Sequence, residues 1–302
     1  MRKIKHYLEY LGVRLLSFAT AVLPLGAARA VGRALGWFVF SAVRIRREVT
    51  INNLKVAFPE KSLPELTKIG RETFQHFGMV MLEFLRALSV PRNQIQQAIV
   101  SVKNKQLLDQ IHQAGNGAIF LTAHFGNWEY AGGWLGAHGY PMQVMVQEQS
   151  NPKVNRLMQR CRERMGMQTI HRGTAMRSYL KALKSGEYAV MLADQDAGRD
   201  GLFVDFFGKA TAAAFGPARF HLKTGAPILL FMTYRDHAHQ LHMEIELLAA
   251  GNQSGADTET MREIMQEYHR RIETWIERYP GQWFWMHKKW KTQPQQRAGQ
   301  SE

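Results

Sequence analysis

The chain has very little cysteine, with only Cys161 among its 302 residues. A single thiol cannot form an internal disulfide, so nothing in the sequence requires an oxidising compartment. Nor does any group of cysteine and histidine have the spacing of a structural zinc site. Stability must therefore come from packing, and an apolar content of 45% over this length is enough for the core of one domain.

Motifs of three common enzyme classes are also missing. The sequence contains no GxSxG nucleophile elbow, no P-loop and no GxGxxG dinucleotide fingerprint. Serine hydrolases of the α/β-hydrolase type, nucleoside triphosphatases and dinucleotide oxidoreductases are therefore disfavoured.

Acidic residues are scarce relative to basic ones. There are 25 Asp and Glu against 39 Lys and Arg, which gives a formal net charge of +14. Three kinds of partner suit such a charge: nucleic acid, an anionic membrane surface, or an acidic substrate or carrier protein. No zinc finger, helix-turn-helix or RNA-binding signature accompanies the charge, so a nucleic acid partner is not expected.

No apolar run is long enough to span a bilayer. The stretches 15–25 and 31–43 are apolar but are interrupted by Pro24, Arg29 and Arg33, and neither reaches the roughly 20 residues that a spanning helix needs. Basic residues surround both stretches, which is typical of an interfacial segment. We expect residues 1–45 to form a membrane anchor of short helices dipping into one leaflet. A cleaved signal peptide is the weaker alternative, because Glu9 and Arg14 spoil its charged region.

The rest of the chain has the pattern of an α/β fold. Short apolar segments near 98–102, 118–122, 142–147, 188–193, 227–234 and 241–248 predict strands, and they alternate with helical segments. Two helices are expected within 44–90, the second starting at Pro64, and one at about 258–278. We predict one catalytic domain over residues 46–292 and a disordered tail over 293–302.

The segment His124-Phe-Gly-Asn-Trp-Glu129 directly follows the apolar run 118–122. A histidine at the end of a buried strand lies at the carboxyl edge of the sheet, where open α/β folds place their sites. Gly126 allows a tight turn and Asn127 can cap a following helix. Glu129 is then close enough to orient the imidazole and raise its basicity. The segment predicts a general-base pair, although most histidines in proteins have no chemical role.

Two further segments could bind ligands. Residues 153–184 hold nine basic side chains and one acid, Glu163, which favours an anionic ligand over a merely solvated face. Asp194 and Asp196 follow the apolar strand near 188–193, so a magnesium site is conceivable there. We favour a structural role in which Asp194 holds an arginine or the histidine turn in place.

Two other segments are open to more than one interpretation. The aromatic and basic tail at 279–291 is typical of an interfacial belt but also fits a packed C-terminal strand. His237, His239 and His242 form a metal-like group near a predicted hairpin turn at 236–239. A solvated turn is the better interpretation of these histidines.

Six segments together resemble the late acyltransferases of lipid A biosynthesis, a branch of the HxxxxE acyltransferase superfamily. In chain order they are TINNLKVAFPE, LTAHFGNWE, NPKVNRLMQRCRERMG, LADQDAG, GPARFHLKTGAPI and YPGQWFWMHKKWK, and they extend from about residue 44 to 291. The resemblance implies a mixed sheet flanked by helices. It also implies an important arginine in the RERMG segment, which we assign to Arg164 first and Arg162 second.

The resemblance implies an O-acyltransferase at the cytoplasmic face of a bacterial inner membrane. His124 would take the proton of an acceptor hydroxyl that attacks an acyl thioester, with Glu129 orienting it and the amides near Gly126 and Asn127 binding the oxyanion. Arg164, helped by Arg162, would bind a phosphate of the acceptor or the developing charge. The implied donor is acyl-acyl carrier protein or acyl-CoA, the acceptor is a lipid A precursor, and neither metal nor organic cofactor is required.

Two alternatives remain open at this stage. An acyltransferase of the same fold could act on another glycolipid or a lysophospholipid, and residues 147–149 differ from the arginine-bearing version of some relatives. A non-catalytic membrane adaptor is the alternative of a different class.

Overall fold

The computed structural model describes residues 2–171, 173–251 and 257–294. Its helices are α1 (Arg2–Val22), α2 (Leu25–Phe38), the π-helix η1 (Val39–Val43), α3 (Arg47–Ala57), α4 (Leu63–Arg86), α5 (Arg92–Ala98), α6 (Lys105–Gln113), α7 (Trp128–Ala137), α8 (Pro152–Arg164), α9 (Ala175–Lys184), α10 (Gly216–Thr224), α11 (Thr258–Arg278) and the 3-10 helix η2 (Pro280–Gln282). Its strands are β1 (Ile99–Lys103), β2 (Ala118–Thr122), β3 (Met142–Val146), β4 (Gln168–His171), β5 (Tyr188–Leu192), β6 (Leu202–Phe206), β7 (Lys209–Ala213), β8 (Ile228–Arg235) and β9 (Leu241–Ala249).

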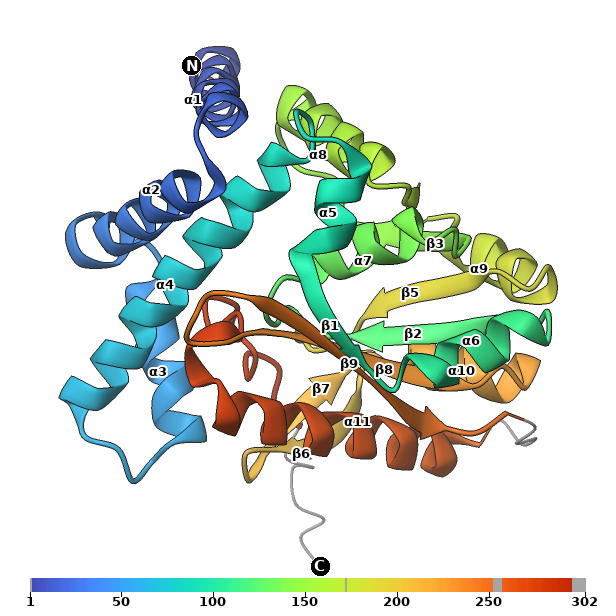
Figure 1. Cartoon of the computed structure of the whole chain (residues 1–302). Coiled ribbons are helices and arrows are strands. Elements are labelled where there is room, and N and C mark those ends of the chain that lie inside the picture. The colour runs from blue at the N-terminus through green and yellow to red at the C-terminus, as the bar shows by residue number, and fades with distance from the viewer. Residues whose placement is uncertain (1, 172, 252–256, 295–302) are drawn as a thin grey trace, which may run out of the picture.

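The main sheet is mixed and has the strand order β1-β9-β8-β2-β5-β3-β4. All neighbouring pairs are parallel except β8 and β9, which form an antiparallel hairpin. A separate antiparallel hairpin, β6 and β7, packs on α11 (Figure 1). The predicted α/β fold with a mixed sheet flanked by helices is confirmed.

Helices cover both faces of this sheet because the central strands alternate their side chains between two apolar layers. Ile119 and Leu121 of β2 pack with α9, α10 and α11, whereas Ala118 and Phe120 pack with α7 and α8. All five residues of β2 are buried. The strand that precedes His124 is thus fixed from both sides.

The N-terminal helices lie against one long helix, α4, at the edge of the molecule (Figure 1). Ser62 and Glu65 form a capping box at the start of α4, so the helix begins at Leu63 with Pro64 in its first turn. Helix α2 approaches α4 so closely that a Cβ on Gly36 would lie 2.0 Å from the carbonyl oxygen of Phe74. Within the described ranges, none of the helices combines the length and apolar character needed to cross a membrane.

Most of the predicted elements are confirmed within a few residues. The six predicted strands correspond to β1, β2, β3, β5, β8 and β9, and the helices over 44–90 and 258–278 correspond to α3, α4 and α11. The short strands β4, β6 and β7 were missed, since none of them has the continuous apolar run of a central strand. Most of the predicted disordered tail, from residue 295 onward, lies outside the described residues.

Candidate active site

The register of the sheet brings His124 and Asp194 together. Strands β2 and β5 are parallel neighbours, and Thr122 at the end of β2 pairs with Leu192 at the end of β5. His124 and Asp194 each lie two residues beyond this pair, so both reach the same carboxyl edge of the sheet. The His124 Nδ1 atom lies 2.8 Å from Asp194 Oδ1.

Asp194 is a buried carboxylate with several donors. It accepts hydrogen bonds from the His124 amide at 2.9 Å and from the Trp283 indole at 2.9 Å, in addition to the His124 ring. Burial raises the pKa of Asp194, but the charge and hydrogen bonds of His124 outweigh it and hold this pKa at about 2. An ionised Asp194 accepts the Nδ1 proton of His124, which leaves Nε2 as the nitrogen available to a substrate. In the structure, Asp194 thus contacts the histidine turn through both the amide and the ring of His124.

Glu129 does not orient His124 as predicted. Its carboxylate binds Arg162 instead, with Arg162 Nη2 2.6 Å from Oε1 and Arg162 Nε 3.1 Å from Oε2. Glu129 lies in the first turn of α7 and its side chain contacts α8. The ring of His124 contacts Asp194, which follows β5. The five-residue spacing of the motif therefore brings both groups to one site without joining them.

The two predicted arginines lie on different sides of α8. Arg162 lines the cavity described below, whereas Arg164 is exposed, with Nη2 3.4 Å from the carbonyl oxygen of Val90. Residues two positions apart on a helix point in nearly opposite directions, which is the reason for the difference. The structure thus places Arg162, and not Arg164, in the lining of the cavity.

The turn between His124 and α7 is held by hydrogen bonds that use its amides. The Gly126 amide donates to the Gln282 carbonyl at 2.9 Å and the Asn127 amide donates to the Thr233 hydroxyl at 3.0 Å. Asn127 caps α7 as predicted, through its side-chain oxygen and the Tyr130 amide. Both amides are already engaged, so in this geometry Gly126 and Asn127 themselves offer no free amide to an oxyanion.

A buried ionic cluster supports the same turn from behind. Glu83 of α4 is 1% exposed and accepts from the Asn127 side chain at 2.8 Å. The Arg235 Nη2 atom lies 2.6 Å from Glu83 Oε2, and Arg29 of α2 binds Oε1. Burial raises the pKa of Glu83, but the two arginines outweigh it and lower this pKa below its usual value. The cluster links the N-terminal helix α2 to the turn that carries His124.

A cavity of about 560 Å³ opens beside His124. Its walls carry the polar residues His124, Glu129 and Arg162, while most of the remaining lining is apolar. The apolar residues come from α4, β3, α8, β5 and the residue before β4: Phe77, Val80, Met81, Phe84, Val144, Val146, Met158, Met167, Val190 and Leu192. Gln147 and Gln149 also line it, so the segment that departs from some relatives borders the site. The volume lies in the usual range for small-ligand sites, about 300–1,000 Å³.

Asp196 has a different role from Asp194. Its carboxylate accepts from the Thr292 hydroxyl at 3.0 Å and its amide donates to His287 Nε2 at 3.1 Å. It therefore ties the C-terminal segment to the site. In the described part of the chain, no group of three or more His, Cys, Asp or Glu side chains is arranged to hold a metal ion.

The aromatic tail is packed into the protein rather than exposed as a belt. Trp283, Trp285 and Trp290 are buried, and Trp283 forms a β-bridge with Phe125. Behind Asp194, the ammonium of buried Lys289 lies 3.1 Å from His269 Nε2, and burial lowers the pKa of Lys289 to about 8. The tail thus forms part of the site, since Trp283 binds Asp194 and Phe284 lines the cavity.

Sequence reasoning missed the residues that support the turn from α2, α4 and β8, namely Arg29, His76, Glu83 and Arg235. His76 Nε2 lies 3.0 Å from the Gly126 carbonyl, and burial lowers the pKa of His76 to about 4. One feature of the sequence could have indicated this cluster: Glu83 is a charged residue between the apolar residues Leu82 and Phe84 of a predicted helix.

Similarity to known proteins shows the family of this chain. Residues 1–292 match the family described as bacterial lipid A biosynthesis acyltransferase. The chain belongs to this family. It is therefore an acyltransferase, and the non-catalytic adaptor loses its support.

Individual relatives of this acyltransferase extend over nearly its whole length. It is 26% identical over 297 residues to the lipid A biosynthesis lauroyltransferase of Escherichia coli (strain K12), covering 96% of this chain and 94% of the relative. It is 25% identical over 292 residues to the palmitoleoyltransferase of the same organism, covering 96% and 93%. A phosphatidylinositol mannoside acyltransferase of Mycobacterium tuberculosis is 33% identical over 129 residues, which is 40% of each chain.

Proposed function

We propose that this acyltransferase moves a fatty acyl chain from a thioester donor to a hydroxyl of a lipid A precursor, with His124 as the general base. The observation that carries the proposal is the His124–Asp194 hydrogen bond at the mouth of a largely apolar cavity. Direct transfer to a hydroxyl requires a base and a place for the acyl chain, and it requires no protein nucleophile.

In the proposed step, His124 Nε2 removes the proton of the acceptor hydroxyl as its oxygen attacks the thioester carbonyl. The tetrahedral intermediate then collapses, the carbon–sulfur bond breaks, and the imidazolium returns its proton to the leaving thiolate. Ionised Asp194 stabilises the imidazolium between these two transfers. The products are the ester of the acceptor and the free thiol of the donor.

The oxyanion of this intermediate needs donors other than Gly126 and Asn127. The first amides of a helix have no acceptor within that helix, and Trp128 and Glu129 provide the first two amides of α7. Both residues line the cavity. We assign the oxyanion to these amides, with the positive end of the α7 dipole adding to the stabilisation.

Arg162 replaces Arg164 as the proposed contact to the acceptor. Its guanidinium is oriented by two hydrogen bonds to Glu129 and packs 5.4 Å from the centre of the Phe84 ring. A guanidinium fixed in this way still has donors for a phosphate of the acceptor or for the developing charge. Glu129 thus acts on the acceptor site through Arg162.

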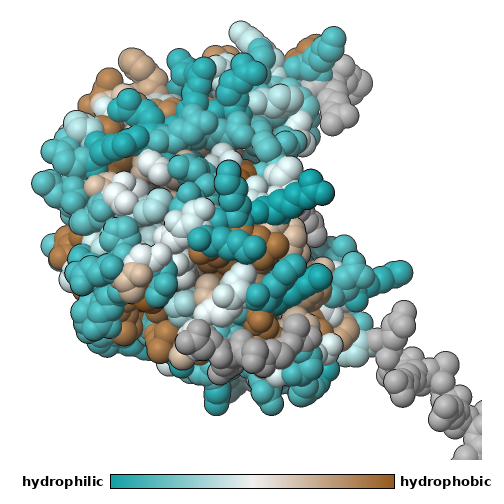
Figure 2. Space-filling model, turned by 90° about the vertical axis from the view of Figure 1, so that its right-hand side faces the viewer, coloured by the Kyte–Doolittle hydropathy of each residue, from teal (hydrophilic) through white to brown (hydrophobic). Residues whose placement is uncertain are grey.

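The proposal also places the enzyme on a membrane, at the cytoplasmic face of a bacterial inner membrane. Helix α1 exposes an apolar stripe at helical spacing, formed by Ile4, Leu8, Leu11, Leu15, Phe18 and Val22. Exposed apolar patches of this kind mark interaction surfaces. The side of the molecule around α6 and α9 is mainly hydrophilic by comparison (Figure 2). We therefore retain residues 1–45 as the proposed anchor and 46–292 as the catalytic domain.

One observation supports an alternative acceptor, a phosphatidylinositol mannoside. The mannoside acyltransferase relative has the higher identity, 33%, although over a shorter segment than the lauroyltransferase at 26%. Acceptor identity is tested by offering a tetra-acylated lipid A precursor and a phosphatidylinositol mannoside in separate micelle assays, each with acyl-acyl carrier protein and with acyl-CoA. Mass spectrometry of the lipid products would support the proposal if only the lipid A precursor gained an acyl chain. Acylation of the mannoside alone would contradict it.

A further inference from the structure

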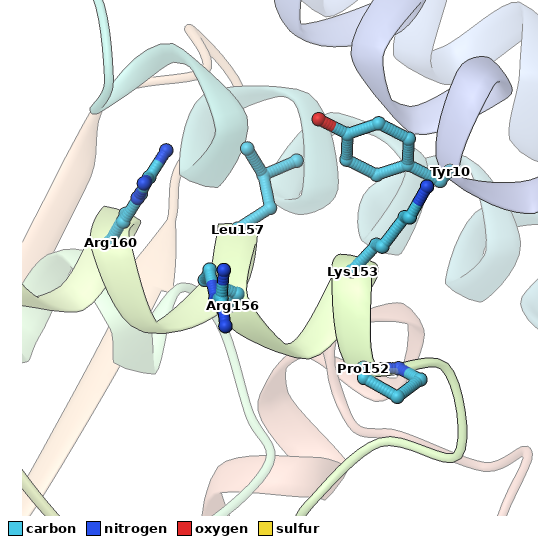
Figure 3. Close-up of a pocket in the computed structure, with 6 residues that line it drawn as sticks. All are labelled: Tyr10, Pro152, Lys153, Arg156, Leu157 and Arg160. Atoms are coloured by element: carbon cyan, nitrogen blue, oxygen red, sulfur yellow. The ribbon is translucent and has the colours of Figure 1, made fainter. Parts of the chain in front are cut away.

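A second pocket, of about 460 Å³, lies between α1 and α8 and is separate from the reaction cavity. It is lined by Tyr10 of α1 and by Pro152, Lys153, Arg156, Leu157 and Arg160 of α8. Figure 3 shows Lys153 and Arg160 pointing to the side of α8 on which Tyr10 lies, with Leu157 between them. The pocket therefore has cationic walls and a partly apolar floor.

Helix α8 separates the two pockets because its side chains divide between opposite faces. Lys153, Arg156 and Arg160 follow each other at spacings of three and four residues and share one face. Met158 and Arg162 lie on the other side and line the reaction cavity. The basic residues of α8 thus line two different pockets, and of these residues only Arg162 takes part in the proposed reaction.

The three cations of the second pocket lack acidic partners. The ion pairs of α1 and α8 involve other residues, Lys5 with Glu9 and Arg162 with Glu129, and no acid among the described residues lies within ion-pair distance of Lys153, Arg156 or Arg160. The Lys153 ammonium instead lies over two aromatic rings, 5.2 Å from the centre of Tyr7 and 5.5 Å from that of Tyr10. The pocket therefore presents three exposed cations with no acid of the described chain in ion-pair distance, which favours the binding of an anion.

Helix α1 presents a matching stripe to this pocket. Lys3, Tyr7, Tyr10 and Arg14 recur at spacings of four, three and four residues, so they form one line along the helix. Each is followed in sequence by a member of the exposed apolar stripe, beginning with Ile4 and Leu8. The order around α1 is thus apolar stripe, aromatic and basic stripe, and then the pocket. This is the arrangement of groups from the acyl region to the headgroup region of a bilayer.

We propose that the pocket between α1 and α8 binds the phosphate of an anionic phospholipid and so fixes how the enzyme sits on the membrane. The proposal rests on the proposed membrane association and adds to it a defined headgroup site. An acidic carrier protein would also be attracted by the charge. The exposed apolar stripe beside the pocket favours a lipid, because a bilayer buries both the apolar and the cationic groups at once.

The test compares flotation of the full-length protein with phosphatidylcholine vesicles and with vesicles of equal parts phosphatidylcholine and phosphatidylglycerol. The triple variant Lys153→Gln/Arg156→Gln/Arg160→Gln removes the pocket cations. The triple variant Lys181→Gln/Lys184→Gln/Lys223→Gln removes the same charge from exposed positions on α9 and α10 and is the matched control. Circular dichroism checks that both variants are folded.

We expect the pocket variant to partition roughly 100-fold less into the anionic vesicles, since each cation near such a surface contributes about fivefold, with neutral vesicles unaffected. The control should retain wild-type partitioning. Equal partitioning of both variants into anionic vesicles would overturn the site. It would also be overturned if the pocket variant lost as much partitioning into neutral vesicles as into anionic ones. Loss of acyl carrier protein binding with unchanged vesicle binding would also overturn it and assign the pocket to the carrier protein.

Acyl transfer in detergent micelles is measured on the same preparations and separates this inference from the proposed reaction. The pocket variant should retain acyl transfer in micelles, where no anionic bilayer is present. If the wild type showed no transfer but still bound anionic vesicles through the pocket, the proposed reaction would fail and the headgroup site would stand.

Discussion

The Nδ1 atom of His124 lies 2.8 Å from Oδ1 of Asp194, a residue 70 positions further along the chain. Glu129, which completes the HxxxxE motif, binds Arg162 and not the histidine. The motif thus contributes the proposed base and a carboxylate that holds an arginine, while a second strand end contributes the carboxylate that binds the histidine. Predictions for Asp194 and for Glu129 differ accordingly.

Asp194 should make stability depend on pH in the acid range. Its folded pKa of about 2 lies below the unfolded value of 3.8, so its stabilisation is complete above the unfolded value and is lost as the pH falls toward the folded one. Urea unfolding of the wild type and Asp194→Asn should show a difference in unfolding free energy that shrinks by about 2 kcal/mol between about pH 5 and about pH 2. A difference that is constant with pH would show that folding does not lower the pKa of Asp194.

Much of this site was predictable from sequence because strand ends are local features. The apolar runs before His124 and Asp194 fixed both residues at the carboxyl edge, and hydrophobic patterning is sufficient for that step. Which residue binds which was not predictable, since the His124–Asp194 contact depends on the register of β2 with β5. The Glu83 cluster was hidden for the same reason, because it joins α2, α4, β8 and the turn, which only the tertiary structure brings together.

Glu129 and Arg162 should be energetically coupled in catalysis. In Glu129→Gln or Arg162→Gln, the remaining partner loses its opposite charge and the two-point contact that holds it in the cavity. We expect each single variant to lower kcat/KM at least about tenfold, and the double variant to resemble the worse single variant, with a coupling energy of about 1–3 kcal/mol.

The matched control is Arg164→Gln, which changes an exposed arginine on the same helix. Its kcat/KM should stay within about twofold of the wild type. Additive effects of the two cavity substitutions, or a larger loss in Arg164→Gln, would refute the coupling.

Glu83→Gln should be one of the most destabilising single substitutions in the protein. The change leaves the buried Arg235 guanidinium without its anionic partner, and Glu83 is itself 1% exposed. Breaking a buried ion pair costs about 3–5 kcal/mol of unfolding free energy. Glu259→Gln removes an exposed partner of Arg262 and should cost less than about 1 kcal/mol. Similar urea midpoints for the two variants would contradict the structural role of Glu83.

Gly126→Ala should distort the turn that carries His124. Gly126 has a φ of +56°, and a Cβ there would lie 1.8 Å from the Thr233 carbonyl oxygen, so the backbone must shift. We expect a loss of more than about 1 kcal/mol in unfolding free energy together with a loss of acyl transfer. Gly216→Ala is the control, because a Cβ at that position meets no atom within 4 Å. Equal stability and activity of the two variants would mean that the turn tolerates a side chain.

The central claim is that His124, held by Asp194, is the base of an acyl transfer. The most direct test is transfer from radiolabelled acyl-acyl carrier protein to a tetra-acylated lipid A precursor in detergent micelles, with wild type, His124→Ala and Asp194→Asn. The account predicts labelled product with the wild type and a loss of kcat of about 10²–10⁴ in both variants, with KM nearly unchanged. Equal product from all three proteins would contradict it.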